Sequence, residues 1–322
     1  SFIIFFRLCS LFLSLICLKM YQPINSLDIP ENKMQELKST GYYHCKDVDT
    51  DNPLWDVLTR TPETKTALDL YHEEQKMGSI RTFIDHFDDA LGGGIPIGKI
   101  TEFCGESGTG KTQLCFQLCV TVQLPSWCGG LDGAAVFLST NQSFATHRIR
   151  QIALGVVNHY EFIKTKHLVH RKRKVEELCV DKIMGNISHI YITDHIELMA
   201  VLIKLKQFIN DHPMVRLVVI DSISAPLKTL NGQERTTVVF NFFREVQRLS
   251  QEFCFAIVIT NDLTTRIGSG SAAYQTPSLG GSYYHRINLR VELEKKSSPV
   301  FKAIITKNAL KPEREIEFTL LA

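Results

Sequence analysis

The sequence predicts an α/β fold with a mixed, mostly parallel sheet. Two observations support this fold class. Apolar segments of four to six residues alternate with helical segments from about residue 66 to residue 260, and a glycine-rich loop joins the first of these segments to a helix. Strands that are apolar throughout are buried on both faces, and parallel sheets achieve this burial by packing helices on each side.

The expected elements alternate regularly through most of the chain. Helices are predicted at 67–75 and 111–123, and strands at 100–103, 134–139, 189–193, 217–221 and 255–260. The segments 287–293, 300–306 and 315–321 follow closely on one another, so we expect consecutive strands that extend the same sheet. Together these segments predict a core spanning residues 66–322.

The region before the core contains too few apolar residues for an independent domain. Residues 20–48 predict one short helix, with Leu37 on its apolar face and Gly41 as its stop. Residues 49–65 are rich in Pro, Asp and Thr, which is typical of a linker.

Residues 1–19 form an apolar run broken mainly by Arg7 and several serines. Three interpretations are considered: a signal peptide, a membrane anchor, and an upstream extension of the gene model with translation starting at Met20. We expect the third, because the rest of the chain has the composition of an intracellular protein and no small-residue cleavage site is visible.

The bulk composition narrows the possible partners. The formal net charge is +2, so binding to nucleic acid would have to come from local basic patches. The nine cysteines contain no C-x-x-C pair, which makes a zinc ribbon an unfavourable interpretation and fits a reducing compartment. Cys115 and Cys119 share a helical face, and we expect them to pack in the core rather than bind metal.

Residues 105–112 read G-E-S-G-T-G-K-T and match the phosphate-loop pattern G-x-x-x-x-G-K-[ST] between a strand and a helix. Backbone N–H groups of such a loop surround phosphate oxygens, and the helix N-terminus adds positive potential. The predicted nucleotide-binding residues are therefore Gly105, Glu106, Ser107, Gly108, Thr109, Gly110, Lys111 and Thr112. Lys111 would reach the β- and γ-phosphates of ATP, and the hydroxyl of Thr112 would bind Mg²⁺.

Asp221 is the second predicted metal ligand, because it ends the apolar segment 217–221. A carboxylate at the end of a buried strand is costly unless a cation or hydrogen-bond donors lie nearby. We therefore expect Asp221 to lie in the inner or outer shell of the Mg²⁺ ion.

Several segments resemble the Rad51 family, the eukaryotic recombinases of the RecA superfamily, and within it the paralogs designated C. The segments that carry the resemblance are LGGGIP at 91–96, the phosphate loop followed by Gln113, VRLVVIDSISAPLK at 215–228, ITND at 259–262 and LGGSYYH at 279–285. The resemblance covers about residues 66–321 and implies a RecA-like P-loop ATPase core. A weaker similarity at 26–48 implies a truncated helix-hairpin-helix segment.

The resemblance adds four residues to the predicted nucleotide site. Gln113 follows the phosphate loop, Arg148 matches the arginine that stacks on adenine, and Asn261 matches the residue that reads the γ-phosphate. His285 matches a histidine between the nucleotide and a DNA loop. A solvated helix arginine and a hydrogen-bonded core histidine are the alternatives for Arg148 and His285.

The chain also departs from the family pattern. Asn141 stands where the family has the glutamate that activates water, so the predicted catalytic residues are Lys111 and an altered Asn141. An amide can orient water but cannot accept its proton, and hydrolysis is expected to be weak. Asp262 replaces a glutamine, Lys307 replaces an aspartate, and residues 47–80 lack the phenylalanine with which family members polymerise.

Two loops are expected to face DNA by analogy with the family. The loop 225–236 contains Lys228 and Arg235, and the loop 263–281 contains Arg266. So few charges imply modest counterion release. The basic run 164–174 is expected to be a solvated helix face, with phosphate binding or nuclear import as alternatives.

These features predict an ATP- and Mg²⁺-dependent recombinase paralog. We expect a nuclear protein, present partly in the cytoplasm, that binds DNA and other paralogs in a hetero-oligomer. It would assist strand-exchange filaments in DNA damage repair by homologous recombination, in mitotic or meiotic cells. The alternatives are an autonomous DNA-dependent ATPase with strand-exchange activity, or a membrane-anchored P-loop protein if residues 1–19 are retained.

Overall fold

The computed structural model describes residues 24, 31–44, 47–48, 64–167, 178–267, 273–279, 283–297, 299–309 and 311–320. The chain divides into two compact units, residues 1–70 and 71–322. In the first unit, helix α2 (Glu31–Ser39) is followed by Gly41 with a φ of 87°. The apolar run 1–19, nearly all of the linker 49–65 and residues 168–174 of the basic run lie outside the described residues.

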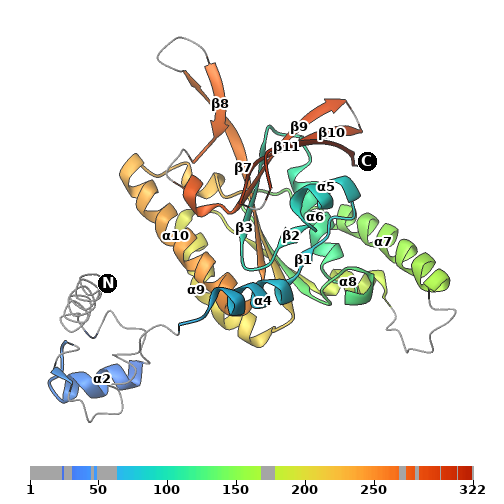
Figure 1. Cartoon of the computed structure of the whole chain (residues 1–322). Coiled ribbons are helices and arrows are strands. Elements are labelled where there is room, and N and C mark those ends of the chain that lie inside the picture. Colours follow the sequence, from blue (N-terminus) through green and yellow to red (C-terminus); the bar gives the residue numbers. More distant parts are fainter. Residues whose placement is uncertain are drawn as a thin grey trace, which may run out of the picture. The chain divides into compact units, whose positions relative to one another are not determined.

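The second unit is built on a nine-stranded sheet with the order β11-β10-β9-β3-β7-β6-β4-β5. Strand β8 pairs with β7 (Figure 1). The strands are β3 (Ile100–Gly105), β4 (Ala134–Ser139), β5 (Ile187–Tyr191), β6 (Val215–Asp221), β7 (Ala256–Ile267), β8 (Ala273–Pro277), β9 (Leu289–Ser297), β10 (Val300–Asn308) and β11 (Arg314–Thr319). From β9 to β5 along this order the pairs are parallel, whereas β10 and β11 pair antiparallel. The predicted α/β fold with a mixed, mostly parallel sheet is confirmed.

Helices cover both faces of this sheet (Figure 1). The main helices are α5 (Asp85–Leu91), α6 (Lys111–Thr121), α7 (Thr146–His167), α8 (Val180–Gly185), α9 (His195–Asp211) and α10 (Gly232–Phe253). Side chains alternate between two buried clusters, so Phe137 of β4 packs in the cluster with α6 while Leu138 packs in the cluster with α9 and α10. This alternation explains why the strands are apolar at consecutive positions.

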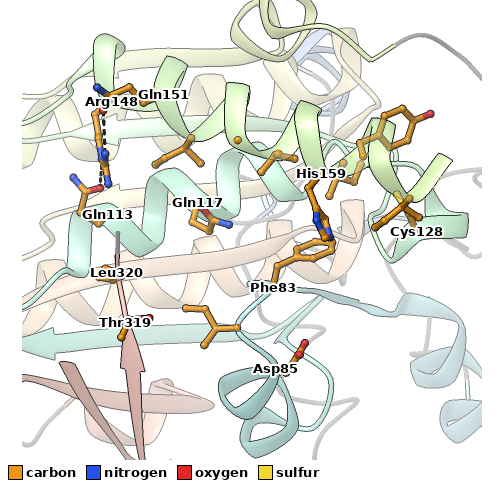
Figure 2. A pocket seen from close by; sticks show the side chains of 17 residues that line it. Phe83, Asp85, Gln113, Gln117, Cys128, Arg148, Gln151, His159, Thr319 and Leu320 are labelled. Atoms are coloured by element: carbon orange, nitrogen blue, oxygen red, sulfur yellow. Dashed lines mark hydrogen bonds between the residues drawn. The ribbon is translucent and has the colours of Figure 1, made fainter. Parts of the chain in front are cut away.

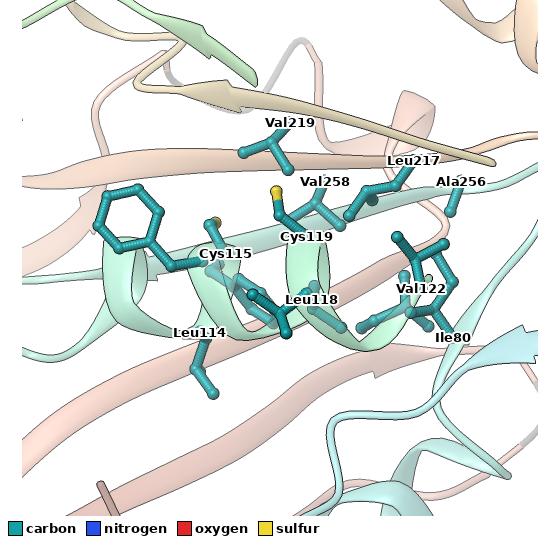
Figure 3. Packing of buried hydrophobic residues seen from close by; sticks show 14 of the residues in the cluster. Ile80, Leu114, Cys115, Leu118, Cys119, Val122, Leu217, Val219, Ala256 and Val258 are labelled. Atoms are coloured by element: carbon teal, nitrogen blue, oxygen red, sulfur yellow. The ribbon is translucent and has the colours of Figure 1, made fainter. Parts of the chain in front are cut away.

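Helix α6 packs against the middle of the sheet with its apolar face (Figure 3). Cys115 and Cys119 lie on this face, are fully buried, and pack near Val219 and Val258. Burial raises the pKa of both thiols well above the ordinary value. The prediction that these two cysteines pack in the core is confirmed.

The predicted strand at 255–260 is too short. Strand β7 continues to Ile267 and pairs antiparallel with β8, from Leu263 opposite Pro277 to Ile267 opposite Ala273. Residues 263–267 and 273–277 therefore form a hairpin rather than the continuous loop expected over 263–281. Thr264 and Thr265 are β-branched, which suits an extended conformation, and the neighbouring glycines and serines had suggested a loop.

Two other predicted boundaries are also wrong. Strand β5 begins at Ile187 and ends at Tyr191. Each end therefore lies two residues earlier in the chain than in the predicted strand 189–193. The loop expected over 225–236 is shorter, because residues Ala225–Leu227 form a 3-10 turn and α10 begins at Gly232. Glu234 in the first turn of α10 favours this helix start, because its charge complements the helix dipole.

Helix α9 begins with reciprocal capping hydrogen bonds. The Glu197 backbone N–H donates to Asp194 Oδ1 at 2.8 Å, and the Thr193 N–H donates to Glu197 Oε2 at 2.8 Å. The cap holds the start of a helix that buries Leu198, Leu202, Leu205 and Ile209.

We expect Asp194→Ala to lower the free energy of unfolding by about 1 kcal/mol, because one N–H at the helix start loses its acceptor. Urea unfolding followed by circular dichroism measures this loss. Lys204→Ala, at an exposed position in the middle of α9, is the control and should leave the unfolding midpoint nearly in place. Equal midpoints for Asp194→Ala and the unaltered protein would contradict the capping role.

No helix among the described residues is long and apolar enough to cross a lipid bilayer.

Candidate nucleotide site

The phosphate loop joins β3 to α6 and requires glycine at two positions for steric reasons. A Cβ at Gly105 would lie 2.4 Å from the carbonyl oxygen of Leu293, which is its neighbour on β9. Gly110 has a φ of 89°, a left-handed backbone conformation that residues with a Cβ rarely adopt. These two positions let the backbone turn tightly into the N-terminus of α6, where its N–H groups suit an anion.

Lys111 is the first residue of α6 and is almost completely buried. Its Nζ donates to the carbonyl oxygens of Gly105 at 2.7 Å and Glu106 at 2.8 Å. The same Nζ lies 3.6 Å from Asp262 Oδ1. The ammonium group is thus held over the loop, where an anionic ligand would meet a positive charge with little reorganisation of the protein.

Asp221 and Thr112 meet at the base of the loop. Thr112 Oγ1 donates to Asp221 Oδ2 at 2.7 Å, and Thr260 Oγ1 donates to Oδ1 at 2.5 Å. Ser143 Oγ lies 3.3 Å from Oδ2. These hydroxyl donors offset part of the cost of burying the carboxylate. Carboxylate and hydroxyl oxygens are also the ligands that Mg²⁺ prefers, so Thr112 and Asp221 fit a divalent cation.

A cleft of about 650 Å³ lies over the loop. Its lining residues are Ser107, Gly108, Thr109, Gly110, Lys111, Thr112, Gln113, Asn141, Ser143, Arg148, Gln151, Asp221, Ser222, Asp262, Phe301 and Leu320. The structure therefore brings together most of the predicted nucleotide-binding residues. This cleft fits a nucleoside triphosphate or diphosphate with its metal ion, because it combines a glycine-rich loop, a buried lysine and a hydroxyl–carboxylate pair.

Asn141 lies in this cleft and not in the core. Its Oδ1 accepts hydrogen bonds from the Ser143 backbone N–H at 3.3 Å and from the Ser143 hydroxyl. Ser143 also reaches Asp221, so the amide is connected to the predicted metal site through one side chain. The side chain is placed to orient a polar ligand, but it offers no carboxylate.

A second groove, of about 680 Å³, lies between α6 and α7 and adjoins the cleft. Gln113, Arg148, Gln151 and Leu320 line both cavities. Arg148 Nε donates to Gln113 Oε1 at 2.7 Å and its Nη1 donates to Gln151 Oε1 at 2.9 Å (Figure 2). The guanidinium plane is thus held at the junction of the phosphate cleft and a largely apolar groove, where a flat base could stack on it.

Four of the predicted nucleotide-binding residues do not line the cleft: Gly105, Glu106, Asn261 and His285. Asn261 is fully buried, donates to Glu102 Oε1 at 2.9 Å and accepts from Ser278 Oγ at 2.6 Å. His285 lies on the surface, edge-on to the ring of Tyr284. Neither side chain is therefore among those that line the cleft of this chain, and Asp262 faces the cleft in place of Asn261.

Gly105 and Glu106 support the loop from outside the cleft lining. The carbonyl oxygens of both residues accept hydrogen bonds from Lys111. The Glu106 side chain points elsewhere and accepts a hydrogen bond from Gln275 Nε2 of β8 at 2.6 Å. This contact joins the phosphate loop to the β7–β8 hairpin.

A buried ionic network fixes the strands behind the cleft. Glu102 of β3 forms an ion pair with Arg290 of β9 and accepts a hydrogen bond from the Tyr283 hydroxyl at 2.5 Å. Burial and the Glu102 charge raise the pKa of Tyr283 above its ordinary range. The network contains Asn261, so the hydrogen bonds of this residue hold β7 against β3.

The predicted DNA-facing residues have different surroundings. Lys228 is 65% exposed, and its Nζ lies 3.9 Å from Asp262 Oδ2. Arg235 lies in α10 and its guanidinium donates to the Leu230 carbonyl oxygen at 2.8 Å and 3.2 Å. The backbone of Arg266 belongs to the β7–β8 hairpin, opposite Tyr274. Lys228 is therefore close to an acid of the nucleotide cleft, whereas the Arg235 guanidinium is bonded to the backbone just before α10.

Sequence reasoning missed Phe301, Leu320 and Ser143 as lining residues of the cleft. Phe301 and Leu320 come from the C-terminal part of the chain and reach the loop only through the order of strands β9, β10 and β11. Ser143 stands two residues after Asn141, and its position in a loop after a buried strand was a usable signal.

Comparison with known proteins agrees with this architecture. Residues 73–322 match the family model described as Rad51. The chain belongs to the Rad51 family. It is 34% identical over 274 residues to "DNA repair protein RAD51 homolog 3" of Cricetulus griseus, covering 84% of this chain and 74% of that protein. It is 30% identical over 254 residues to the protein of the same name from Dictyostelium discoideum, covering 75% of this chain and 66% of that protein.

Membership of this family confirms the predicted RecA-like core, and the similarity to the RAD51 homolog 3 proteins confirms the resemblance to the paralogs designated C. A Rad51-family core binds a nucleotide with a divalent metal ion. The cleft over residues 105–112 is where this chain offers the glycine loop, the cation and the acidic oxygen ligands for that purpose.

Proposed function

We propose that this chain is an ATP-binding recombinase paralog that acts in homologous recombination repair of DNA double-strand breaks. The observation that carries the proposal is the complete phosphate loop with the Thr112–Asp221 contact of 2.7 Å, in a chain of the Rad51 family. Lys111 would pair with the β- and γ-phosphates, Thr112 and Asp221 would hold Mg²⁺, and Arg148 would stack on the base. Mg²⁺ would neutralise charge on the phosphates while these residues position them.

Hydrolysis by the isolated chain is proposed to be weak. Asn141 is the cleft residue at the position of the expected general base, and an amide cannot take the proton of the attacking water. The side chain would still orient water through its hydrogen-bonding partners around Ser143. Binding of nucleotide, rather than its turnover, would then control association with partners.

The partners are proposed to be other recombinase paralogs in a hetero-oligomer. Strand β5 pairs with β4 and, among the described residues, has no neighbour on its other side. Exposed apolar side chains lie on β5 and on α9, the helix that follows it in the chain: Tyr191 is 49% exposed, Ile196 66% and Ile203 76%. Residues 47–80 contain no phenylalanine to fill the same edge on a second copy, so a complementary chain fits better than a self-assembling one.

DNA is the proposed second partner, and the nucleus the proposed compartment, with some protein in the cytoplasm. The relatives are named DNA repair proteins, which supports this role. Lys228 and the β7–β8 hairpin adjoin the phosphate loop, so DNA binding there would respond to the nucleotide. Few basic residues lie on these segments, which predicts modest, salt-sensitive affinity.

We expect the purified chain to form no continuous filaments by itself with ATP and single-stranded DNA, because residues 47–80 lack the polymerising phenylalanine and Asp262 and Lys307 depart from the family pattern. Negative-stain electron microscopy measures this directly. Affinity purification of the full chain from cells, followed by identification of the bound proteins, should recover other Rad51-family members. Regular filaments of the isolated chain would contradict the paralog role and favour an autonomous recombinase.

A further inference from the structure

Asp262 lies beside the phosphate loop. It extends from β7 directly opposite Gly105 of β3, and its side chain lines the nucleotide cleft. Asp262 Oδ1 lies 3.6 Å from Lys111 Nζ, the ammonium group that this type of loop presents to the terminal phosphates. A carboxylate therefore occupies the neighbourhood into which the γ-phosphate of a bound triphosphate would extend.

The carboxylate is also held in this place from its other side. Ser224 Oγ donates to Asp262 Oδ2 at 3.0 Å, and Lys228 Nζ lies 3.9 Å from the same oxygen. Turning the side chain away from the cleft would break both contacts. The exposed pair with Lys228 adds little stability by itself, but the Ser224 hydrogen bond fixes the direction of the charge.

We infer that Asp262 makes this site discriminate against nucleoside triphosphates in favour of nucleoside diphosphates. A γ-phosphate would place a second anion within a few ångströms of the Asp262 carboxylate and would compete with it for Lys111. A diphosphate ends one group earlier, where the backbone N–H groups of residues 105–110 surround it. Like charges at this separation repel strongly in a partly desolvated site.

This inference rests on the proposed nucleotide site and adds the nucleotide state that the site favours. Bound Mg²⁺ offsets part of the repulsion for both nucleotides. Its ligands in this chain, Thr112 and Asp221, lie at the base of the loop, whereas Asp262 lies beside Lys111. The discrimination is therefore expected to persist in the presence of magnesium.

The test compares dissociation constants for Mg·ADP and for a non-hydrolysable Mg·ATP analogue, using the full chain and calorimetric titration. Asp262→Asn keeps the size of the side chain and removes its charge. We expect this variant to lower the ratio of the triphosphate constant to the diphosphate constant by roughly tenfold or more. Asp211→Asn removes an equal charge from the exposed end of α9 and should leave the ratio unchanged.

Three outcomes are decisive. Equal ratios for the unaltered chain and Asp262→Asn would overturn the inference while leaving the nucleotide site intact. Weaker triphosphate binding by Asp262→Asn would also overturn it, because the carboxylate would then assist the γ-phosphate or its metal ion. Failure of the unaltered chain to bind either nucleotide would overturn the proposed function itself, and Asp262→Gln repeats the test if Asp262→Asn does not fold.

Discussion

Replacing Lys111 with alanine is expected to abolish detectable binding of MgATP, with a loss in affinity of about 100-fold or more. The side chain is the cation of the phosphate loop, and charge-assisted hydrogen bonds to two phosphates contribute about 1.5–3 kcal/mol each. Its Nζ is already held over the loop by the carbonyl oxygens of Gly105 and Glu106, so little of its interaction energy is lost to ordering. Titration with a fluorescent ATP analogue measures the loss.

Two matched variants separate charge from structure in this experiment. Lys204→Ala removes an exposed lysine from α9 and should bind nucleotide like the unaltered chain. Lys111→Arg keeps the charge but carries a larger planar group in a nearly buried position, so it should retain only part of the affinity. Equal affinities for Lys111→Ala and the unaltered chain would show that the phosphate loop is not the nucleotide site.

Asn141→Glu is expected to raise the rate of ATP hydrolysis at saturating nucleotide. A general base typically contributes about 10²–10⁴-fold, and even partial recovery would be measurable. Asn141 already lies in the cleft, where it is connected through Ser143 to Asp221. The added carboxylate would also repel the triphosphate, so the turnover number is the informative quantity and KM is expected to rise.

Asn141→Gln is the control, because it matches glutamate in size and lacks the charge. Its turnover should stay as low as that of the unaltered chain in phosphate-release assays. A high turnover of the unaltered chain that neither variant changes would instead support the autonomous DNA-dependent ATPase, with another group activating the water.

The sequence alone was sufficient for those features that are encoded within a few consecutive residues. The glycines of the phosphate loop, Lys111 and Thr112 form a short motif set by the backbone geometry of a loop that leads into a helix, so they could be located without a structure. Asp221 was found for a similar reason, since an acid that ends an apolar strand is conspicuous. The alternation of strands and helices likewise predicted the sheet and its covered faces.

The position of each side chain around the loop depended on strand pairing, which the sequence does not specify. Neighbouring residues on a strand face opposite sides, so the register of β7 against β3 decides that Asp262 faces the cleft and Asn261 faces Glu102. Phe301 and Leu320 reach the loop only because β10 and β11 continue the sheet beyond β9. The hairpin of β7 with β8 arises from backbone pairing between segments whose composition suggested a loop. The residues of the phosphate loop could thus be identified from a short stretch of sequence. The tertiary structure instead decided which charged side chains of distant strands face the nucleotide cleft.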